Sequence, residues 1–310
     1  MSMTQLRSKL RLGTRGSPLA LTQANMVRDA LIAAHGLSQD DIEIVTIKTT
    51  GDQVQDRPLA EIGGKALWTK ELDRAMLAGE IDLAVHSMKD VETIRPEPIV
   101  ITAMLPRADV RDRIIGPAGI DALPLGAVIG TSSPRRSAQL RRLRPDLSIV
   151  LLRGNVDTRL NKVASGEIDA TLLAAAGLDR LGRPDVGTGI EIDVMLPAPA
   201  QGAVGIETRA ADTETTALVA AIADAPTMAC VRAERALLLA LGADCHSPMA
   251  ALAVVDGDAL WLRAELFNAD GSAHVAGEAR GPANDLRFAR ELAHDLLAAA
   301  PEGVRALFAK

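Results

Sequence analysis

The sequence is poor in aromatic side chains: among its 310 residues there is no tyrosine, and there are only two tryptophans and three phenylalanines. Many proteins that bind single-stranded nucleic acid stack its bases on aromatic side chains, so we expect no nucleic-acid partner. The formal net charge of −6, from 34 basic and 40 acidic residues, gives the molecule as a whole no attraction for polyanions. An acidic ligand would therefore need a local basic cleft.

Long apolar runs are missing too. Residues 1–12 include basic side chains but no apolar core of a signal peptide, and no stretch of about 18 apolar residues follows. We expect a cytoplasmic protein with no membrane association. Cysteine is scarce: Cys230 and Cys245 are the only two, and a reducing compartment favours thiols over a disulfide. No grouping of Cys and His has metal-ligand spacing, so we expect no metal.

What the sequence does have is a β-α-β pattern near its start. Residues 10–14 are predicted to form a strand, and Ser17 and Pro18 then supply the N-cap and first-turn proline of a helix. The spacing of apolar residues places the buried face of that helix at Ala20, Ala24, Val27 and Leu31. Further strands are expected at 42–46 and 81–86, with a second helix at 65–78 between them.

The same pattern returns later in the chain. Residues 128–134 (VIGTSSP) echo 12–18 (LGTRGSP), and the tetrapeptide Gly-Glu-Ile-Asp occurs at both 79–82 and 166–169. The sequence therefore predicts two similar α/β domains, and a ligand would lie in the cleft between them, at the carboxyl ends of strands.

Two proline-bearing stretches, 96–106 and 197–199, suit crossings between these domains, so the chain is expected to return to the first near Gln201. After residue 227 the pattern changes to a helix at 228–241, strands at 252–255 and 260–267, and a closing helix at 285–299. We predict three domains: 1–104 with 200–224, 105–199, and a small α+β domain, 225–310.

Arginine is dense in the second of these domains. Arg135 and Arg136 follow Thr131, Ser132 and Ser133 where a strand becomes a helix, so hydroxyls, unpaired backbone N–H groups and guanidinium groups converge on one corner. We predict that an anion binds there. The other arginines of this span are Arg141, Arg142, Arg144, Arg153 and Arg159; for the first three, a solvated helix face is the favoured interpretation.

The corresponding corner of the first domain holds Arg15 and Ser17, and Ser17 could cap the helix and contact a ligand at once. Lys89 and Asp90 are neighbours just after the predicted strand 81–86. This pair could be catalytic, or it could be an ordinary surface ion pair that adds little to stability. His86, in the preceding strand, is interpreted as a structural hydrogen-bonding residue.

The two cysteines are predicted to differ. Cys230 is in line with Ala233, Leu237 and Leu241 on an apolar helix stripe, which indicates core packing. Cys245 lies in a loop after that helix and can be exposed and reactive. The polar segment 49–64 suggests either a mobile lid or a merely disordered loop.

Together these features resemble the porphobilinogen deaminase (hydroxymethylbilane synthase) family along almost the whole chain. Five motifs carry the resemblance and occur in the family's order: 14–20 (TRGSPLA), 84–90 (AVHSMKD), 130–136 (GTSSPRR), 152–160 (LRGNVDTRL) and 201–207 (QGAVGIE). The resemblance implies an α/β fold with two periplasmic-binding-protein-like domains around a central cleft plus the small C-terminal domain. It implies a monomeric transferase of haem biosynthesis that condenses four porphobilinogen molecules head to tail, releasing ammonia and yielding hydroxymethylbilane.

The resemblance also implies that a dipyrromethane cofactor is bound covalently, through a thioether, to Cys245, and that Asp90 is the catalytic residue. The cofactor would be contacted by Lys89, Asp90, Thr131, Ser132, Ser133, Arg135 and Arg136, and the substrate and its oligomers by Arg15, Ser17, Lys65, Trp68, Arg153, Arg159 and Gln201. Two other functions remain open on the residues alone: a non-enzymatic solute-binding module with the same two-lobed fold, and a thiol hydrolase that uses Cys245.

Overall fold

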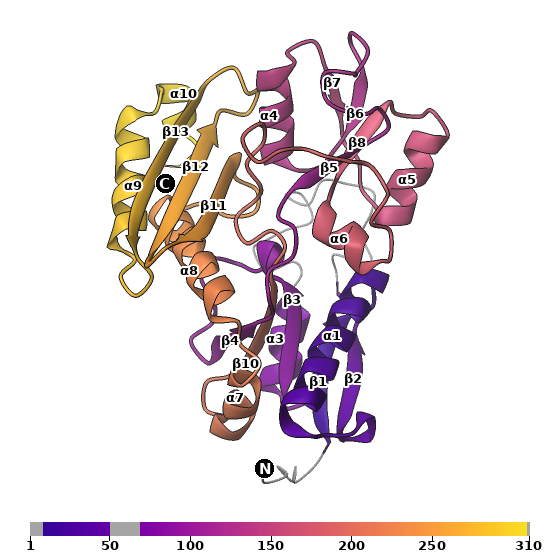
Figure 1. Cartoon of the computed structure of the whole chain (residues 1–310), viewed down its shortest axis with the longest axis vertical. Helices are drawn as coiled ribbons and strands as arrows, with labels where there is room; N and C mark the ends of the chain where they lie inside the picture. The colour runs from indigo at the N-terminus through magenta and orange to yellow at the C-terminus, as the bar shows by residue number, and fades with distance from the viewer. Residues whose placement is uncertain (1–8, 50–68, 309–310) are drawn as a thin grey trace. The chain divides into compact units, whose positions relative to one another are not determined.

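The computed structural model describes residues 9–49 and 69–308. It divides into two units, shown within the whole chain in Figure 1. Unit 1 comprises Met1–Ala108 and Ala203–Met228, and unit 2 comprises Asp109–Gly202 and Ala229–Lys310. The chain thus passes from unit 1 to unit 2, back, and forward again.

Unit 1 is built on a five-stranded sheet with the order β2-β1-β3-β10-β4. Strand β1 pairs in parallel with β2 and β3, whereas β10 pairs antiparallel with both β3 and β4. The strands are β1 (Leu10–Arg15), β2 (Ile42–Ile47), β3 (Leu83–Ser87), β4 (Ile99–Met104) and β10 (Val204–Arg209).

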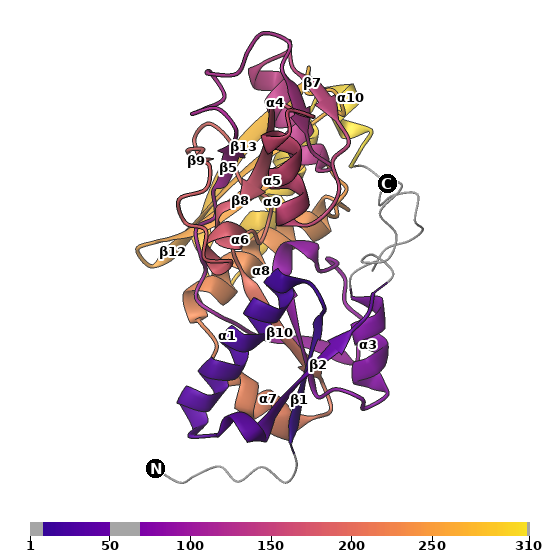
Figure 2. The ribbon, with the colours of Figure 1, turned by 90° about the vertical axis from the view of Figure 1, so that its right-hand side faces the viewer.

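Helices cover both faces of this sheet. Helices α1 (Pro18–His35) and α7 (Thr213–Ala220) pack on one face, and α3 (Lys70–Leu77) packs on the other. Figure 2 shows α1 and α3 on opposite sides of the strands. Short 3-10 turns at Gln39–Asp41 and Met88–Asp90 precede β2 and follow β3. The faces stay distinct because side chains alternate along a strand.

Helix α1 begins and packs as the sequence predicts. The Ser17 hydroxyl accepts a hydrogen bond from the backbone N–H of Ala20, Pro18 lies in the first turn, and Gly36 ends the helix in the left-handed conformation. The buried side chains include Ala20, Ala24, Val27 and Leu31, and the fifth is Gln23, which the apolar spacing did not indicate.

Unit 2 contains a second five-stranded sheet, ordered β7-β6-β8-β5-β9. It repeats the topology of the first sheet: β6 pairs in parallel with β7 and β8, and β5 pairs antiparallel with β8 and β9. Ser133 caps α4 as Ser17 caps α1, which confirms the repeat. The elements are β5 (Asp112–Ile115), β6 (Val128–Gly130), α4 (Pro134–Leu143), β7 (Ser148–Val150), α5 (Val156–Ala164), β8 (Ala170–Ala174), α6 (Ala175–Arg180) and β9 (Thr188–Gly189).

The C-terminal part of unit 2 is an antiparallel three-stranded sheet, β11-β12-β13, with helices packed on one face. Its elements are α8 (Ala225–Ala240, which starts in unit 1), β11 (Met249–Asp256), β12 (Ala259–Phe267), β13 (His274–Pro282), α9 (Arg287–Ala299) and α10 (Glu302–Arg305). The opposite face, through Ala250 and Leu252, packs with Ala138 of α4. The α/β class with a small α+β C-terminal part is therefore confirmed.

Strand β13 was missed by the sequence analysis. Its exposed and partly buried residues alternate, and two of its residues are glycines, so it lacks the apolar pattern of a strand. The glycines are needed for close packing: a Cβ on Gly281 would lie 2.3 Å from Cδ1 of Phe288 on α9.

Within the described residues, no single helix is long and apolar enough to cross a membrane. The pair Thr213–Ala220 and Ala225–Ala240, bent by 111°, meets that test together by length and composition alone.

Candidate functional site

A pocket in unit 1 lies where β1 and β3 end. It is bounded by the start of α1, by the last residues of β3 and by the short turn that carries Asp90. Asp90 and Arg15 therefore line the same pocket, one with a carboxylate and the other with a guanidinium group. The lining residues are Arg15, Ser17, Leu19, Ala20, Gln23, Val85, His86, Ser87, Asp90 and Val91.

Two polar side chains of this pocket were not found by the sequence analysis. Gln23 of α1 is 2% exposed, and its Nε2 donates to Oγ of Ser87 at the end of β3 at 2.8 Å. This contact joins the helix to the strand directly before the Asp90 turn. Ser17 lies beside them as the cap of α1, so the predicted capping is confirmed, and its contact with a ligand stays a prediction.

His86, which lines the pocket, also belongs to a buried cluster of polar and charged side chains. His86 Nε2 lies 3.1 Å from Oε2 of Glu207 on β10, which agrees with the structural role predicted for His86. Arg95 pairs with the other oxygen of Glu207 and with Asp73 and Glu92. Burial alone would raise the pKa of Glu207, but its contacts with His86 and Arg95 outweigh burial and hold this pKa at about 2. Glu207 on β10 thus contacts both His86 on β3 and Arg95.

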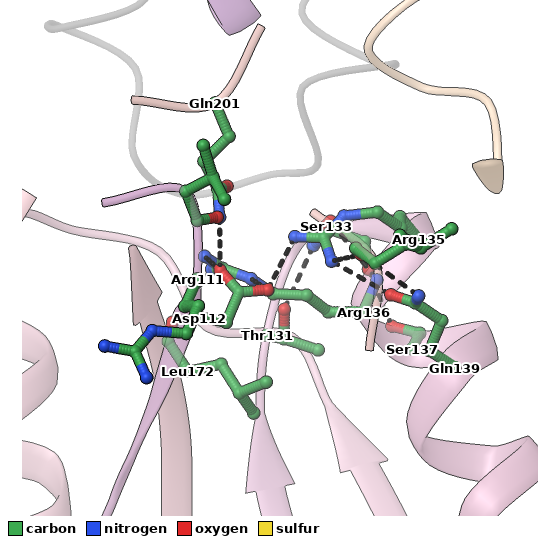
Figure 3. A network of polar contacts seen from close by, with 12 residues as sticks. Arg111, Asp112, Thr131, Ser133, Arg135, Arg136, Ser137, Gln139, Leu172 and Gln201 are labelled. Atoms are coloured by element: carbon green, nitrogen blue, oxygen red, sulfur yellow. Dashed lines mark hydrogen bonds and ion pairs between the residues drawn. The ribbon is translucent and has the colours of Figure 1, made fainter. Parts of the chain in front are cut away.

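In unit 2, Arg135 and Arg136 lie in the first turn of α4 and turn inward rather than toward solvent, with exposures of 3% and 7%. Both bind one buried carboxylate, Asp112 at the start of β5 (Figure 3). Nη2 of Arg135 lies 2.8 Å from Oδ2 of Asp112, and Nη2 of Arg136 lies 2.7 Å from Oδ1. Gln201 donates from Nε2 to the same Oδ1 at 2.9 Å.

These contacts determine the charge of the corner. Burial by itself would raise the pKa of Asp112, but Arg135 and Arg136 overcome this and keep that pKa far below its ordinary value. Burial lowers the pKa of Arg135, and Asp112 opposes that effect. The sequence analysis identified both arginines but missed Asp112, whose position 23 residues before Arg135 gives no local signal.

The hydroxyl groups of this corner stabilise its turn. Thr131 Oγ1 accepts from the backbone N–H of Ser133 at 3.1 Å, and Ser133 Oγ accepts from that of Arg136 at 3.4 Å. Ser132 lies between them and is partly buried. Gln201 is buried, and its amide also donates to the Val110 carbonyl at 2.8 Å, so it links the two chain segments that cross between units.

Of the arginines expected on a solvated helix face, Arg142 is exposed on α4. Arg144 departs from that expectation: it is partly buried at the end of α4, pairs with Asp146 at 2.8 Å and donates from Nη1 to the Ile120 and Leu123 carbonyls at 3.2 Å. Arg153 lies in the loop that leads from β7 into α5, and Arg159 lies in α5. Nε of Arg159 donates to the Gly154 carbonyl at 3.0 Å.

Arg180, at the end of α6, was not predicted as a site residue. Its Nη2 donates to the Gly202 carbonyl at 2.7 Å, whereas its buried Nε has no acceptor among the described residues. Burial, only partly opposed by Asp179, lowers the pKa of Arg180.

The two cysteines differ as predicted. Cys230 is buried among the residues between α8, α9 and the C-terminal sheet, and Cys245 is exposed in the loop after α8. That loop is shaped by Asp244, whose Oδ1 accepts from the backbone N–H of His246 at 2.9 Å. Ser247 Oγ in turn accepts from the N–H of Asp244 at 3.1 Å. Lys65, Trp68 and residues 50–64 of the predicted lid lie outside the described residues.

Comparison with known proteins adds independent findings. The family model described as "Porphobilinogen deaminase, dipyromethane cofactor binding domain" matches residues 10–217, and that of the "Porphobilinogen deaminase, C-terminal domain" matches 228–299. A porphobilinogen deaminase of Sphingopyxis alaskensis is 58% identical over 97% of this chain and 96% of its own length. Another, of Paracoccus denitrificans, is 53% identical over 96% of this chain and 98% of its own. A solved periplasmic substrate-binding protein from Coxiella burnetii aligns with 73% of this chain and 94% of its own, at 16% identity and a TM-score of 0.43.

Proposed function

The chain belongs to the porphobilinogen deaminase family, and from that membership we propose that it joins porphobilinogen molecules head to tail, with release of ammonia, to give hydroxymethylbilane. The observation that carries the proposal is the unit 1 pocket whose lining includes both Asp90 and Arg15. A single carboxylate that can stabilise a cation and move protons is what this condensation requires, because positive charge develops on pyrrole nitrogens. The guanidinium group of Arg15 supplies a partner for a substrate carboxylate.

Two features of unit 2 fit a dipyrromethane group. Cys245 offers an exposed thiol, and the corner at Arg135 and Arg136 holds two guanidinium groups against one carboxylate, which suits a ligand rich in carboxylates. When bound, this group supplies the pyrrole carbon to which the first substrate is joined. Cys245 would hold it through a thioether, and the other residues that would bind it are Lys89, Asp90, Thr131, Ser132, Ser133, Arg135 and Arg136.

The other site residues act in proton transfer, in positioning and in substrate binding. Asp90 holds and relays the protons that the reaction moves, and Gln23 and Ser87 fix the strand end from which its turn starts. The substrate and its oligomers would contact Arg15, Ser17, Lys65, Trp68, Arg153, Arg159 and Gln201. The protein would act as a cytoplasmic monomer, with residues 225–310 as a third domain that carries Cys245.

Intact-mass spectrometry of the purified protein tests this function. The wild type should be heavier than its sequence by two linked pyrrole units and should consume porphobilinogen. Cys245→Ser should lose the added mass, and Cys230→Ser, which changes the buried thiol, should keep it. An unmodified wild type that still consumes porphobilinogen would refute the covalent cofactor.

A further inference from the structure

Residues 86–95 of unit 1 contain Asp90, and one carboxylate, that of Glu207 on β10, contacts both ends of this segment. At the first end, Nε2 of His86 lies 3.1 Å from Oε2 of Glu207. At the second end, Arg95 donates from Nε to Oε1 at 2.7 Å and from Nη2 to Oε2 at 2.9 Å. The Glu207 side chain is 0% exposed, so water does not compete for these contacts. The segment that carries Asp90 is therefore attached to β10 at both ends.

Arg95 also connects the second end to the start of helix α3. Its Nη2 donates to the carboxylate of Asp73, and its Nη1 donates to the carboxylate of Glu92 and the hydroxyl of Thr69. Every nitrogen of the guanidinium group is thus engaged, and the side chain is 7% exposed. A planar group with donors in fixed directions can serve all these acceptors in one orientation. Arg95 consequently fixes the chain just after Asp90 against both α3 and β10.

The turn that carries Asp90 lies between these two ends. The backbone N–H of Met88 donates to the Ala203 carbonyl at 3.0 Å, and the Met88 side chain packs over Gly205, where a Cβ would lie 2.0 Å from its sulfur. Asp90 ends the turn and lines the unit 1 pocket together with His86. A shift at either end of residues 86–95 would therefore move the Asp90 carboxylate relative to the pocket.

We propose that Glu207 and Arg95 are positioning residues for Asp90: they hold the two ends of residues 86–95 and so keep its carboxylate where proton transfer requires it. The inference rests on the proposed function, in which Asp90 moves protons. Among the described residues that line the pocket are Asp90 and His86 but neither Glu207 nor Arg95, so these two act through the segment. Displacing a catalytic group by about 1 Å can lower a rate about a hundredfold.

Steady-state kinetics of Arg95→Lys tests this assignment on cofactor-loaded protein, at a temperature where circular dichroism shows the variant to be folded. Lysine keeps the positive charge, but its compact ammonium group lacks the planar fork that joins Glu207 to α3. We expect kcat to fall at least about tenfold and KM to change less than about threefold, because Arg15 lies on β1, outside the segment.

A double variant separates positioning from a general loss of structure. Once Asp90→Asn has removed the proton-transferring group, adding Arg95→Lys should lower kcat less than about twofold further, because Arg95 acts through Asp90. Equal fold losses with and without Asp90 would overturn the proposal. Near-normal turnover of Asp90→Asn alone would instead show that the proposed role of Asp90 is wrong, and the inference would fall with it.

The matched control is Asp82→Asn, which breaks an ion cluster at the opposite end of β3. Asp82 precedes this strand and contacts Arg11 at 2.8 Å and Arg209 at 3.2 Å. The variant should lose stability but keep kcat within about twofold of the wild type, since the Asp90 segment is untouched. A loss of kcat equal to that of Arg95→Lys would overturn the proposal.

Glu207→Gln is the second variant, and it decides the matter if Arg95→Lys does not fold. Glutamine keeps the size of the side chain but loses the charge that faces both His86 and Arg95. In the folded variant, kcat should again fall at least about tenfold, with little further loss when Asp90→Asn is already present. A normal kcat in folded Glu207→Gln would overturn the proposal. Failure of the covalent cofactor is seen separately, as a wild type without added mass.

Discussion

Replacing Glu207 with glutamine should destabilise unit 1 strongly at neutral pH and weakly in acid. Glu207 is completely buried and lies between His86 and Arg95. These neighbours hold its pKa at about 2, against an ordinary value of 4.5. The pKa is lowered in the folded state, so the stabilisation is fully present above pH 4.5 and is lost as the pH falls toward 2.

The size of the effect follows from the two pKa values. Their difference corresponds to about 3 kcal/mol of stability at neutral pH, which falls below about 1 kcal/mol near pH 2.5. Glutamine resembles the protonated carboxyl group, so the gap between wild type and variant should follow the same curve. Burial raises the pKa of Asp73, and the neighbouring Glu207 adds to this effect.

Urea unfolding followed by far-UV circular dichroism, repeated at several pH values from 7 to 3, measures this gap. Glu278→Gln is the control, because Glu278 pairs with Arg280 on an exposed strand, where an ion pair adds little. A gap that is equally large at pH 7 and pH 3 would refute the electrostatic explanation and assign the loss to packing.

Three further predictions concern activity. Asp90→Asn should keep substrate binding but lower kcat at least about a hundredfold in a steady-state assay, because an amide relays no proton. Near-normal turnover would show that Asp90 is not catalytic and only forms a surface ion pair. Arg135→Ala should lower kcat/KM at least about tenfold more than Arg142→Ala, since Arg135 is buried at the corner and Arg142 is exposed; equal losses would contradict this. In Trp261→Phe, Trp68 is the only tryptophan left, and its fluorescence should change as porphobilinogen is added to active enzyme. An unchanged emission spectrum would show that Trp68 does not contact the growing pyrrole oligomer.

The local features of the two strand-to-helix corners could be predicted from the sequence, and the contacts that complete them could not. A serine followed by proline after a short strand determines a helix start by itself, so Ser17 and Ser133 were found. Likewise, apolar spacing along one helix was enough to separate buried Cys230 from exposed Cys245.

Asp112 and Gln23 escaped detection for a physical reason. A single Asp at the start of a strand, or a Gln within an amphipathic helix, is ordinarily solvated, and nothing nearby in the sequence indicates otherwise. Their partners are distant in the chain: Arg136 lies 24 residues from Asp112, and Ser87 lies 64 residues from Gln23. Only the fold brings these groups together, so the burial that gives them a role is a tertiary property.

The position of β10 between β3 and β4 has a consequence for biosynthesis. The sheet of unit 1 needs a strand that begins at Val204, whereas the five strands of the unit 2 sheet all lie between Asp112 and Gly189. As the chain leaves the ribosome from its N-terminus, the later sheet can therefore be complete before the earlier one. Until Arg209 has emerged, β3 has an open edge and β4 has no partner in the sheet. The sheet of unit 1 therefore stays unfinished until more than half of the chain has been translated. A chain released before that point would expose strand edges and be prone to edge-to-edge aggregation.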